Sequence, residues 1–349
     1  MSNCRNPLQC IVPPFMLKKM ADSPNEKVRR FAIDSIGASS GMRAVRKMLS
    51  RMQFFAAIPS PRGRKYRLVY NGGHLPFLPG KLVRSEGDPK HRDVSVNEAY
   101  DFSGFTYDFY KKLFDRNSLD DNGMSLLSTV HTRRRFNNAF WNGEQMAYGD
   151  GDGIVFDRFT RSLEVVGHEL THGVVTFTAN LDYENQPGAL NEHFADVMGI
   201  LVRQWRKNES AAKGSWLIGA ELLKPAPTRR ALRDLAAPGT AYVDDADLGT
   251  DPQPKHMDDF YDGPDDNGGV HINSGIPNHA FFKVATSLGG KAWQKAGRIW
   301  YEALRSLSAK SQFQDAAETT VQIAGTRYDS NTAKVVRDAW AAVGIKVES

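Results

Sequence analysis

The stretch VVGHELTHGVV, residues 165–175, decides how this chain is interpreted. Its apolar residues predict a buried segment, yet His168, Glu169 and His172 interrupt them. Burying three ionisable groups without partners would cost several kcal/mol. On a helix, His168 and His172 share one face, whereas Glu169 is rotated by about 100° from His168. Two histidines with a carboxylate beside them form the His-Glu-x-x-His arrangement of a zinc site and its general base.

A catalytic zinc ion needs three protein ligands and one open position for water. The helical segment GALNEHFADVMG, residues 188–199, offers Glu192 as the third ligand. Asp196, one turn further along, is expected to accept the second ring N–H of a ligand histidine and fix its tautomer. His193 is expected to face away from this pair, at the helix surface.

Hydrophobic patterning along the chain predicts an α+β protein with a β-rich half and an α-helical half. Residues 66–153 contain short apolar runs between Gly and Asn turns, which favours strands and loops. Residues 25–52 have helical spacing that Gly37 and Gly41 are expected to divide into two short helices. The later helices are expected at 161–179, 188–206, 216–223, 275–288, 290–307, 312–325 and 330–343.

The composition is that of a soluble globular protein, with 41% hydrophobic and 24% charged residues among 349. No run of about 18 apolar residues occurs, so no membrane span is expected. The first 20 residues do not resemble a signal peptide, so synthesis in the cytoplasm is expected, and export by a non-classical route stays open. Cys4 and Cys10 are expected to be flexible thiols, with a bridge between them as the alternative.

Charge is distributed unevenly. Residues 1–65 carry 13 Lys or Arg against 3 Asp or Glu, whereas the rest carries 32 against 37. The basic segment is either a solvated tail or a segment that docks on an acidic body. It lacks interleaved aromatic residues, so a nucleic-acid partner is not expected. IPSPRGRK, residues 58–65, has the composition of an exposed, cleavable linker.

Four motifs, in this order, resemble the thermolysin family of zinc metallopeptidases. They are NNAFWNGEQMAYGDGDG (137–153), HELTH (168–172), GALNEHFAD (188–196) and DNGGVHINSGIPNHAF (266–281). The resemblance runs from about Val96 to the C-terminus. It implies a β-rich N-terminal domain, 61–180, and an α-helical C-terminal domain, 181–349, with the cleft along a central zinc-binding helix.

The resemblance also implies a role for each matching residue. The zinc ligands would be His168, His172 and Glu192. Glu169 would be the general base, Tyr183 and His271 would donate to the oxyanion, and Asp266 would orient His271. With this machinery complete, a zinc-dependent neutral endopeptidase is the expected function. A catalytically silent zinc-binding protein is the alternative.

The substrate contacts follow from the same resemblance. Asn138 and Ala139 would pair with an extended peptide backbone, and Arg233 would bind a substrate carbonyl. The pocket after the scissile bond would be lined by Phe156, Phe159, Val165, Ile218, Leu222 and Leu232. Because all six are apolar, we expect cleavage before large hydrophobic residues of protein or peptide substrates.

Two regions depart from the extracellular members of the family. Arg203, Leu217 and Ala220 stand where those proteins carry calcium-binding carboxylates, so the double Ca2+ site is expected to be absent. A single Ca2+ near the acidic loop 244–266 stays open. The segment PPFML, residues 13–17, resembles the short-precursor, protealysin-like branch. Residues 1–60 are therefore expected to be an inhibitory pro-segment of a monomeric enzyme, cleaved somewhere within 48–65.

Overall fold

A computed structural model describes residues 9–51, 60 and 64–348 of the chain, and the side chains of residues 43–51 are left out of the description. The larger sheet has six strands in the order β1-β5-β6-β4-β2-β3. These are β1 (Gln9–Cys10), β2 (Arg67–Asn71), β3 (Lys81–Ser85), β4 (Leu126–Val130), β5 (Ala139–Trp141) and β6 (Met146–Tyr148). β2, β4 and β6 are parallel neighbours, so their carboxyl ends lie along one edge.

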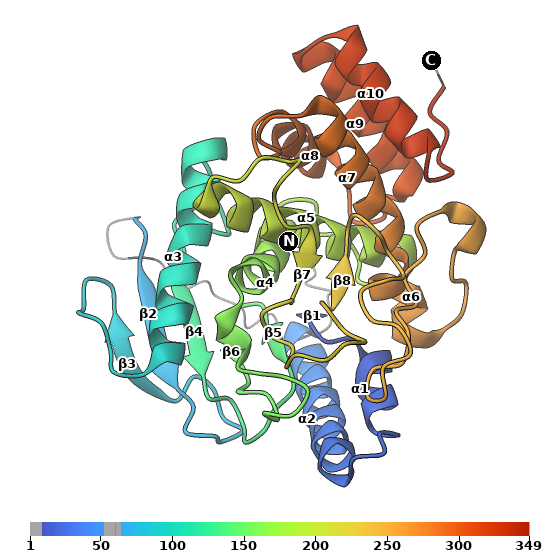
Figure 1. Cartoon of the computed structure of the whole chain (residues 1–349). Helices are drawn as coiled ribbons and strands as arrows, with labels where there is room; N and C mark the ends of the chain where they lie inside the picture. The colour runs from blue at the N-terminus through green and yellow to red at the C-terminus, as the bar shows by residue number, and fades with distance from the viewer. Residues whose placement is uncertain (1–8, 52–59, 61–63, 349) are drawn as a thin grey trace.

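A long helix, α3 (Val94–Phe114), packs against this sheet (Figure 1). The sequence predicted mostly strands and loops across 66–153, and it did not reveal this helix. The aromatic residues of α3 favour strands, but the buried positions Val96, Ala99, Tyr100 and Ser103 recur at helical spacing. The Asp93 carboxylate caps the helix by accepting the Ser95 backbone N–H at 2.9 Å.

Two buried helices form the centre of the molecule, α4 (Leu163–Thr176) and α5 (Asn185–Lys207). They pack against each other through Gly167 and Gly199. A Cβ atom on Gly199 would lie only 3.0 Å from the His168 backbone nitrogen. The missing side chains let the helices approach closely, and this brings the α4 histidines to Glu192 of α5.

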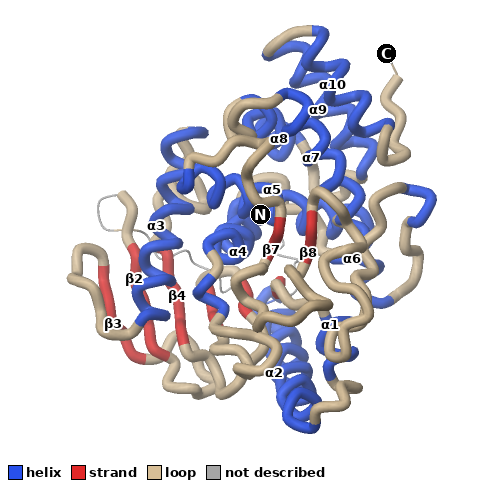
Figure 2. Tube along the Cα trace, in the orientation of Figure 1, coloured by secondary structure: helices blue, strands red, loops and turns tan. Residues whose placement is uncertain are grey.

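From Asp265 onward the chain is mainly helical, in agreement with the α+β prediction. Figure 2 shows helices α7 to α10 grouped away from strands β2, β3 and β4. The helices are α6 (Asp265–Asn273), α7 (Gly275–Leu288), α8 (Lys295–Ser306), α9 (Phe313–Arg327) and α10 (Ser330–Ala341), with 3-10 turns η2 (Phe159–Arg161) and η3 (Met257–Asp259). The helix expected at 216–223 was wrong, because β7 (Leu217–Ile218) pairs there with β8 (Arg233–Asp234).

The N-terminal segment docks on the body of the protein. It forms β1, α1 (Pro14–Met20) and α2 (Glu26–Arg51), and the division expected at Gly37 and Gly41 was wrong. A glycine costs a helix only about 1 kcal/mol, and buried residues such as Ala32 and Ser35 on one face of α2 favour its continuation. The Ser35 hydroxyl accepts the Asn137 N–H at 3.0 Å.

Polar contacts add to this docking. Lys18 forms an ion pair of 3.0 Å with Asp265, and the Ser23 hydroxyl donates to Asp247 at 2.6 Å. These contacts favour a docked segment over a solvated tail. Cys4 and most of the expected linker 58–65 lie outside the described residues. Within the described part of the chain, no helix is long and apolar enough to cross a membrane.

Candidate active site

The three expected zinc ligands meet between α4 and α5. Nε2 of His168 lies 3.0 Å from Nε2 of His172. In the Glu192 carboxylate, Oε2 lies 3.5 Å from Nε2 of His168 and Oε1 lies 3.5 Å from Nε2 of His172. All three side chains are buried, and their ligand atoms lie within 4.8 Å of one another. Helix packing therefore brings two nitrogens and one carboxylate to a common point.

The chemistry of this donor set fits a zinc ion. Burial lowers the pKa of His172 to about 3, so its imidazole is neutral. Nε2 of His168 and Nε2 of His172 face each other, and Oε2 of Glu192 has no hydrogen-bond partner among the residues that the structure describes. A buried carboxylate in this position is costly unless a cation compensates it. Nitrogen and carboxylate ligands in this number are those of catalytic zinc sites.

A further layer of side chains holds the two histidines. Oδ1 of Asp196 lies 2.8 Å from Nδ1 of His168, and the side-chain Oδ1 of Asn191 lies 2.8 Å from Nδ1 of His172. Arg233 donates two hydrogen bonds of 2.8 Å to Asp196, and the Asn278 amide donates a third at 2.9 Å. Although burial opposes it, Arg233 holds the pKa of Asp196 far below its usual range.

Asn191 and Asn278 were not identified from the sequence. Asn191 directly precedes Glu192, and this position one residue before a ligand was the signal available. Asn278 lies 82 residues from Asp196 in the sequence, so only the folded chain reveals their contact.

The surface position expected for His193 was wrong. Its side chain is 0% exposed. Nδ1 lies 2.8 Å from the side-chain Oδ1 of Asn278, and the Trp300 indole N–H donates to Nε2 at 2.7 Å. Helix α5 is enclosed by α4 on one side and by α7 and α8 on the other. The face opposite Glu192 is therefore buried as well.

Glu169 and the two expected oxyanion donors surround the metal ligands. Oε2 of Glu169 accepts the Trp141 backbone N–H at 3.0 Å. Burial and then the nearby Glu192 carboxylate raise the pKa of Glu169 well above its usual value. The Tyr183 hydroxyl donates to Glu192 and lies 3.3 Å from Nε2 of His271.

Asp266 binds His271 twice. Its carboxylate lies 2.7 Å from Nδ1 of His271 and accepts the His271 backbone N–H, also at 2.7 Å. Burial opposes protonation, but Asp266 and Glu192 raise the pKa of His271 to about 9. Near neutral pH, His271 is therefore an imidazolium that donates from Nε2.

The N-terminal segment lies directly over these groups. β1 pairs antiparallel with β5, and the Ile11 N–H donates to the Ala139 carbonyl at 3.2 Å. The Asn138 side chain exchanges two hydrogen bonds with Val12, of 3.0 and 3.2 Å. Arg233 donates to the Ile11 carbonyl at 3.2 Å. The residues expected to bind substrate thus bind residues 11 and 12 of the same chain.

Cys10 is the residue of this segment that contacts His271. Its carbonyl oxygen lies 3.0 Å from Nε2 of His271. The expectation of a flexible thiol was wrong for Cys10, whose side chain is 2% exposed. Pairing of β1 with the sheet edge fixes its backbone.

The six residues expected to line the apolar pocket are all buried. They belong to the same hydrophobic cluster as Ile11, which is itself buried. At the positions expected to lack calcium ligands, Arg203 lies 3.8 Å from the buried Glu164 and 2.9 Å from Glu209. A guanidinium group therefore stands beside a carboxylate that is fully enclosed.

A buried His-His-Glu cluster with a glutamate beside it, between a sheet and a helical region, defines a metallopeptidase. A family model described as "Thermolysin metallopeptidase, catalytic domain" matches residues 79–176. A second, "Thermolysin metallopeptidase, alpha-helical domain", matches residues 179–345. The chain therefore belongs to the thermolysin family of metallopeptidases.

Individual relatives agree with this assignment. The chain is 43% identical to "Extracellular metalloprotease" of Pectobacterium carotovorum subsp. carotovorum, over 98% of this chain and 97% of that protein. It is 50% identical to "Protease PrtS" of Photorhabdus sp. (strain Az29), over 81% and 77% respectively. The solved structure "Precursor of Protealysin, Metalloproteinase from Serratia proteamaculans" superposes with a TM-score of 0.88 at 44% identity, covering 97% of this chain and 99% of that one.

These similarities support the expected activity. The protein is a zinc-dependent neutral endopeptidase of thermolysin type, and its form fits a protealysin-like precursor. The alternative of a catalytically silent zinc-binding protein is not favoured.

Proposed function

We propose that this endopeptidase is a zymogen whose own residues 10–12 block the substrate cleft. The observation that carries the proposal is the set of backbone contacts made by Cys10, Ile11 and Val12. An extended peptide on the β5 edge would use the same Ala139 carbonyl, Asn138 amide and Arg233 guanidinium. Substrate and pro-segment therefore compete for one set of hydrogen bonds.

The bound segment also suggests how a substrate would lie. Because the Cys10 carbonyl faces His271 and the Ile11 carbonyl faces Arg233, the Cys10–Ile11 peptide bond occupies the position of a scissile bond. Ile11 would then fill the pocket lined by the six apolar residues. This arrangement supports cleavage before large hydrophobic residues.

Each polar group has a separate task in the proposed reaction. His168, His172 and Glu192 would hold the zinc ion, which supplies Lewis acidity and lowers the pKa of water to about 7. Glu169 takes the proton from the attacking water and later delivers it to the leaving amine. Tyr183 and protonated His271 donate hydrogen bonds to the carbonyl oxygen as its negative charge develops. Asp266 keeps His271 protonated and oriented.

The domain limits belong to this proposal. Residues 1–60 would be the pro-segment, 61–180 the β-rich domain and 181–349 the α-helical domain, with activating cleavage within 48–65. Arg203 would supply the positive charge near Glu164, so the double Ca2+ site would be absent. Because one relative is named an extracellular metalloprotease, we include action on proteins outside the cell.

The first experiment compares wild type with Glu169→Ala. Intact mass and N-terminal sequence are followed over time in purified protein with one equivalent of zinc. Wild type should lose about 50–60 residues and gain peptidase activity, because only it can activate water. Glu209→Ala serves as a control carboxylate variant and should mature normally. Equal cutting of wild type and Glu169→Ala would mean that another protease is responsible and would contradict self-processing.

A further inference from the structure

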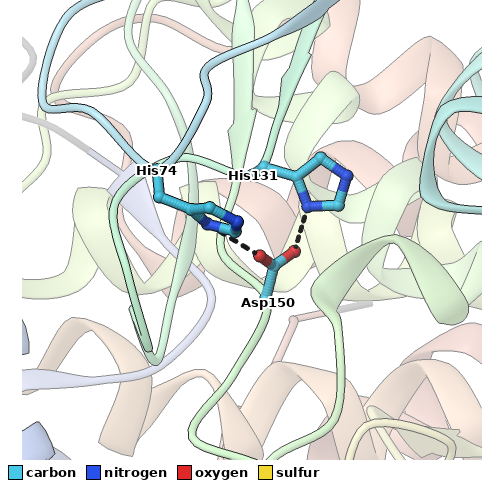
Figure 3. A group of neighbouring side chains, drawn as sticks. All are labelled: His74, His131 and Asp150. Atoms are coloured by element: carbon cyan, nitrogen blue, oxygen red, sulfur yellow. Dashed lines mark hydrogen bonds and ion pairs between the residues drawn. The ribbon is translucent and has the colours of Figure 1, made fainter. Parts of the chain in front are cut away.

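A second group of metal-ligating side chains lies at the carboxyl ends of three strands of the large sheet. His74 follows β2, His131 directly follows β4, and Asp150 follows β6. These three strands are parallel neighbours, so the chain leaves all of them at the same edge. Figure 3 shows both imidazoles directed at the Asp150 carboxylate. Sheet topology thus brings together residues that are far apart in the sequence.

The spacing of these donors is close to that of a metal site. One Asp150 oxygen lies 2.8 Å from Nδ1 of His131, and the other lies 3.3 Å from Nδ1 of His74. The three residues offer ligand atoms that all lie within 4.8 Å of one another. Tetrahedral zinc with bonds of about 2.0–2.1 Å places its ligand atoms roughly 3.3 Å apart. The ligand atoms would have to approach one another by up to about 1.5 Å to hold an ion.

The cluster also has the support that metal ligands use. Nε2 of His131 lies 2.7 Å from Asp93, whose other oxygen accepts the Ser95 N–H at the start of α3. A carboxylate on the far nitrogen orients a ligand histidine and raises its basicity. The His74 backbone N–H donates to the His131 carbonyl at 2.9 Å, which ties the two ligand loops together.

We propose that His74, His131 and Asp150 form a second metal site for a divalent transition-metal ion such as Zn2+. Two imidazoles and one carboxylate favour zinc and its neighbours over Ca2+ or Mg2+. The His74 side chain is 47% exposed, so an ion can enter and water can complete the coordination. This site is built from other residues than the catalytic cluster, and the proposal does not rest on the proposed function.

The expected role of the ion is to stabilise the substrate-binding edge. The segment between His131 and Asn138 is bound to the β6 end through Thr132 N–H to Tyr148 O, at 3.0 Å, and Gly149 N–H to Asn138 O, at 2.9 Å. A metal ion bound by both His131 and Asp150 would add a further link between the start of this segment and the residues that follow β6. An ion that binds only the folded chain raises its thermal stability by mass action.

A proton is the competitor for this position. The Asp150 hydrogen bond, followed by Asp93, raises the pKa of His131 to about 9 against the effect of burial. Without an ion, His131 is an imidazolium held between two carboxylates. A metal ion must therefore displace the proton on Nδ1.

The test measures metal stoichiometry in the full-length protein that already carries its catalytic zinc. Wild type, His74→Ala, Asp93→Asn and His256→Ala are dialysed against micromolar ZnCl2, and zinc per chain is determined by mass spectrometry. His256 is the matched control, because it also lies beside an aspartate, Asp258 at 3.2 Å, but outside this cluster. Melting temperatures are recorded with and without the added ZnCl2.

Two zinc ions per chain are expected in wild type and His256→Ala, and one in His74→Ala. Asp93→Asn should weaken the second site by about 10–100-fold while leaving its ligands in place. The melting temperature should rise with ZnCl2 in wild type but not in His74→Ala. One zinc in wild type would show that the cluster holds only a proton, and two in His74→Ala would place the second ion elsewhere. Either result would overturn the proposal.

Discussion

At the scale of single residues, the contacts of His271, the proposed oxyanion donor, explain how it keeps a proton in a buried position. A buried imidazole would be neutral near pH 7, since burial lowers its pKa. Asp266 reverses this by binding both Nδ1 and the backbone N–H of the same residue. Nε2 therefore carries a proton at the point where Cys10 presents its carbonyl. Asp266 fixes the direction of the donor and, together with Glu192, its positive charge.

This geometry predicts the alkaline limit of activity. The raised pKa of His271 means that the imidazolium persists up to about pH 9 and is lost above it. The value of kcat/KM for the matured enzyme should fall as pH rises through that range. In Asp266→Asn the pKa of His271 falls, so this limb should move to lower pH. The exposed neighbour Asp265, which contacts Lys18 of the N-terminal segment, provides the control variant Asp265→Asn. An unmoved limb in Asp266→Asn would assign the alkaline titration to another group.

At the scale of elements, the close approach of α4 and α5 creates the metal-binding centre. Glycines at the crossing let backbone meet backbone, and the ligands project from the adjoining turns. Because the ligands come from both helices, the spacing of the helices is also the spacing of the metal ligands. A change at the crossing should therefore affect folding and metal binding together.

The variant Gly199→Ala tests this coupling. Its added methyl group would press against the backbone of α4, and overpacking of this kind costs about 1–3 kcal/mol. Urea unfolding should show the loss, and a chelator competition should show weaker zinc retention. Gly325 in α9 is the matched control, since a Cβ there meets only Ala333 at an ordinary 3.4 Å. Gly325→Ala should be neutral or stabilising by up to about 1 kcal/mol. Equal effects of the two changes would argue against a special role for the crossing.

At the scale of the whole molecule, the N-terminal segment and the catalytic body share one surface. β1 extends the large sheet, α2 contacts Asn137 through Ser35, and α1 contacts Asp265 at the start of α6 through Lys18. Figure 1 shows both helices beside this part of the body. Ile11 directly follows the proposed scissile bond, and its side chain is buried in the main hydrophobic cluster. The proposed inhibition should depend on it more than on exposed residues of the same segment.

Replacing Ile11 by Asp should weaken the block. A carboxylate in the hydrophobic cluster would be poorly solvated and unpaired, which costs several kcal/mol. Uncut Ile11→Asp protein should therefore hydrolyse a short peptide faster than uncut wild type, with intact mass confirming that no cleavage has occurred. Ile33, on α2 and 58% exposed, gives the control Ile33→Asp, which should behave as wild type. If both variants match wild type, Ile11 does not hold the segment in place.

Local spacing explains which parts of the fold and of the metal site were predictable from the sequence. His168 and His172 lie at i and i+4 on one helix, so their convergence followed from local spacing. Glu192 lies on a second helix, and its place as third ligand followed from the family resemblance. The environment of His193 depends on Trp300, 107 residues away, and no local pattern reports that contact. Helix α3 was missed because Tyr and Phe favour strands, although its buried face has helical spacing. The single helix α2 depends on docking against the body, which outweighs two glycines.

The strand pairing of β1 with β5 has a consequence for the moment of activation. Cutting the chain within 48–65 would remove a covalent bond but none of the contacts between residues 10–12 and the cleft. Before the cut, the tether holds this ligand at an effective concentration in the millimolar range. After the cut, occupancy depends on the total concentration of protein in solution. Scission and release are then separate events, and dilution rather than cleavage would determine when the cleft opens.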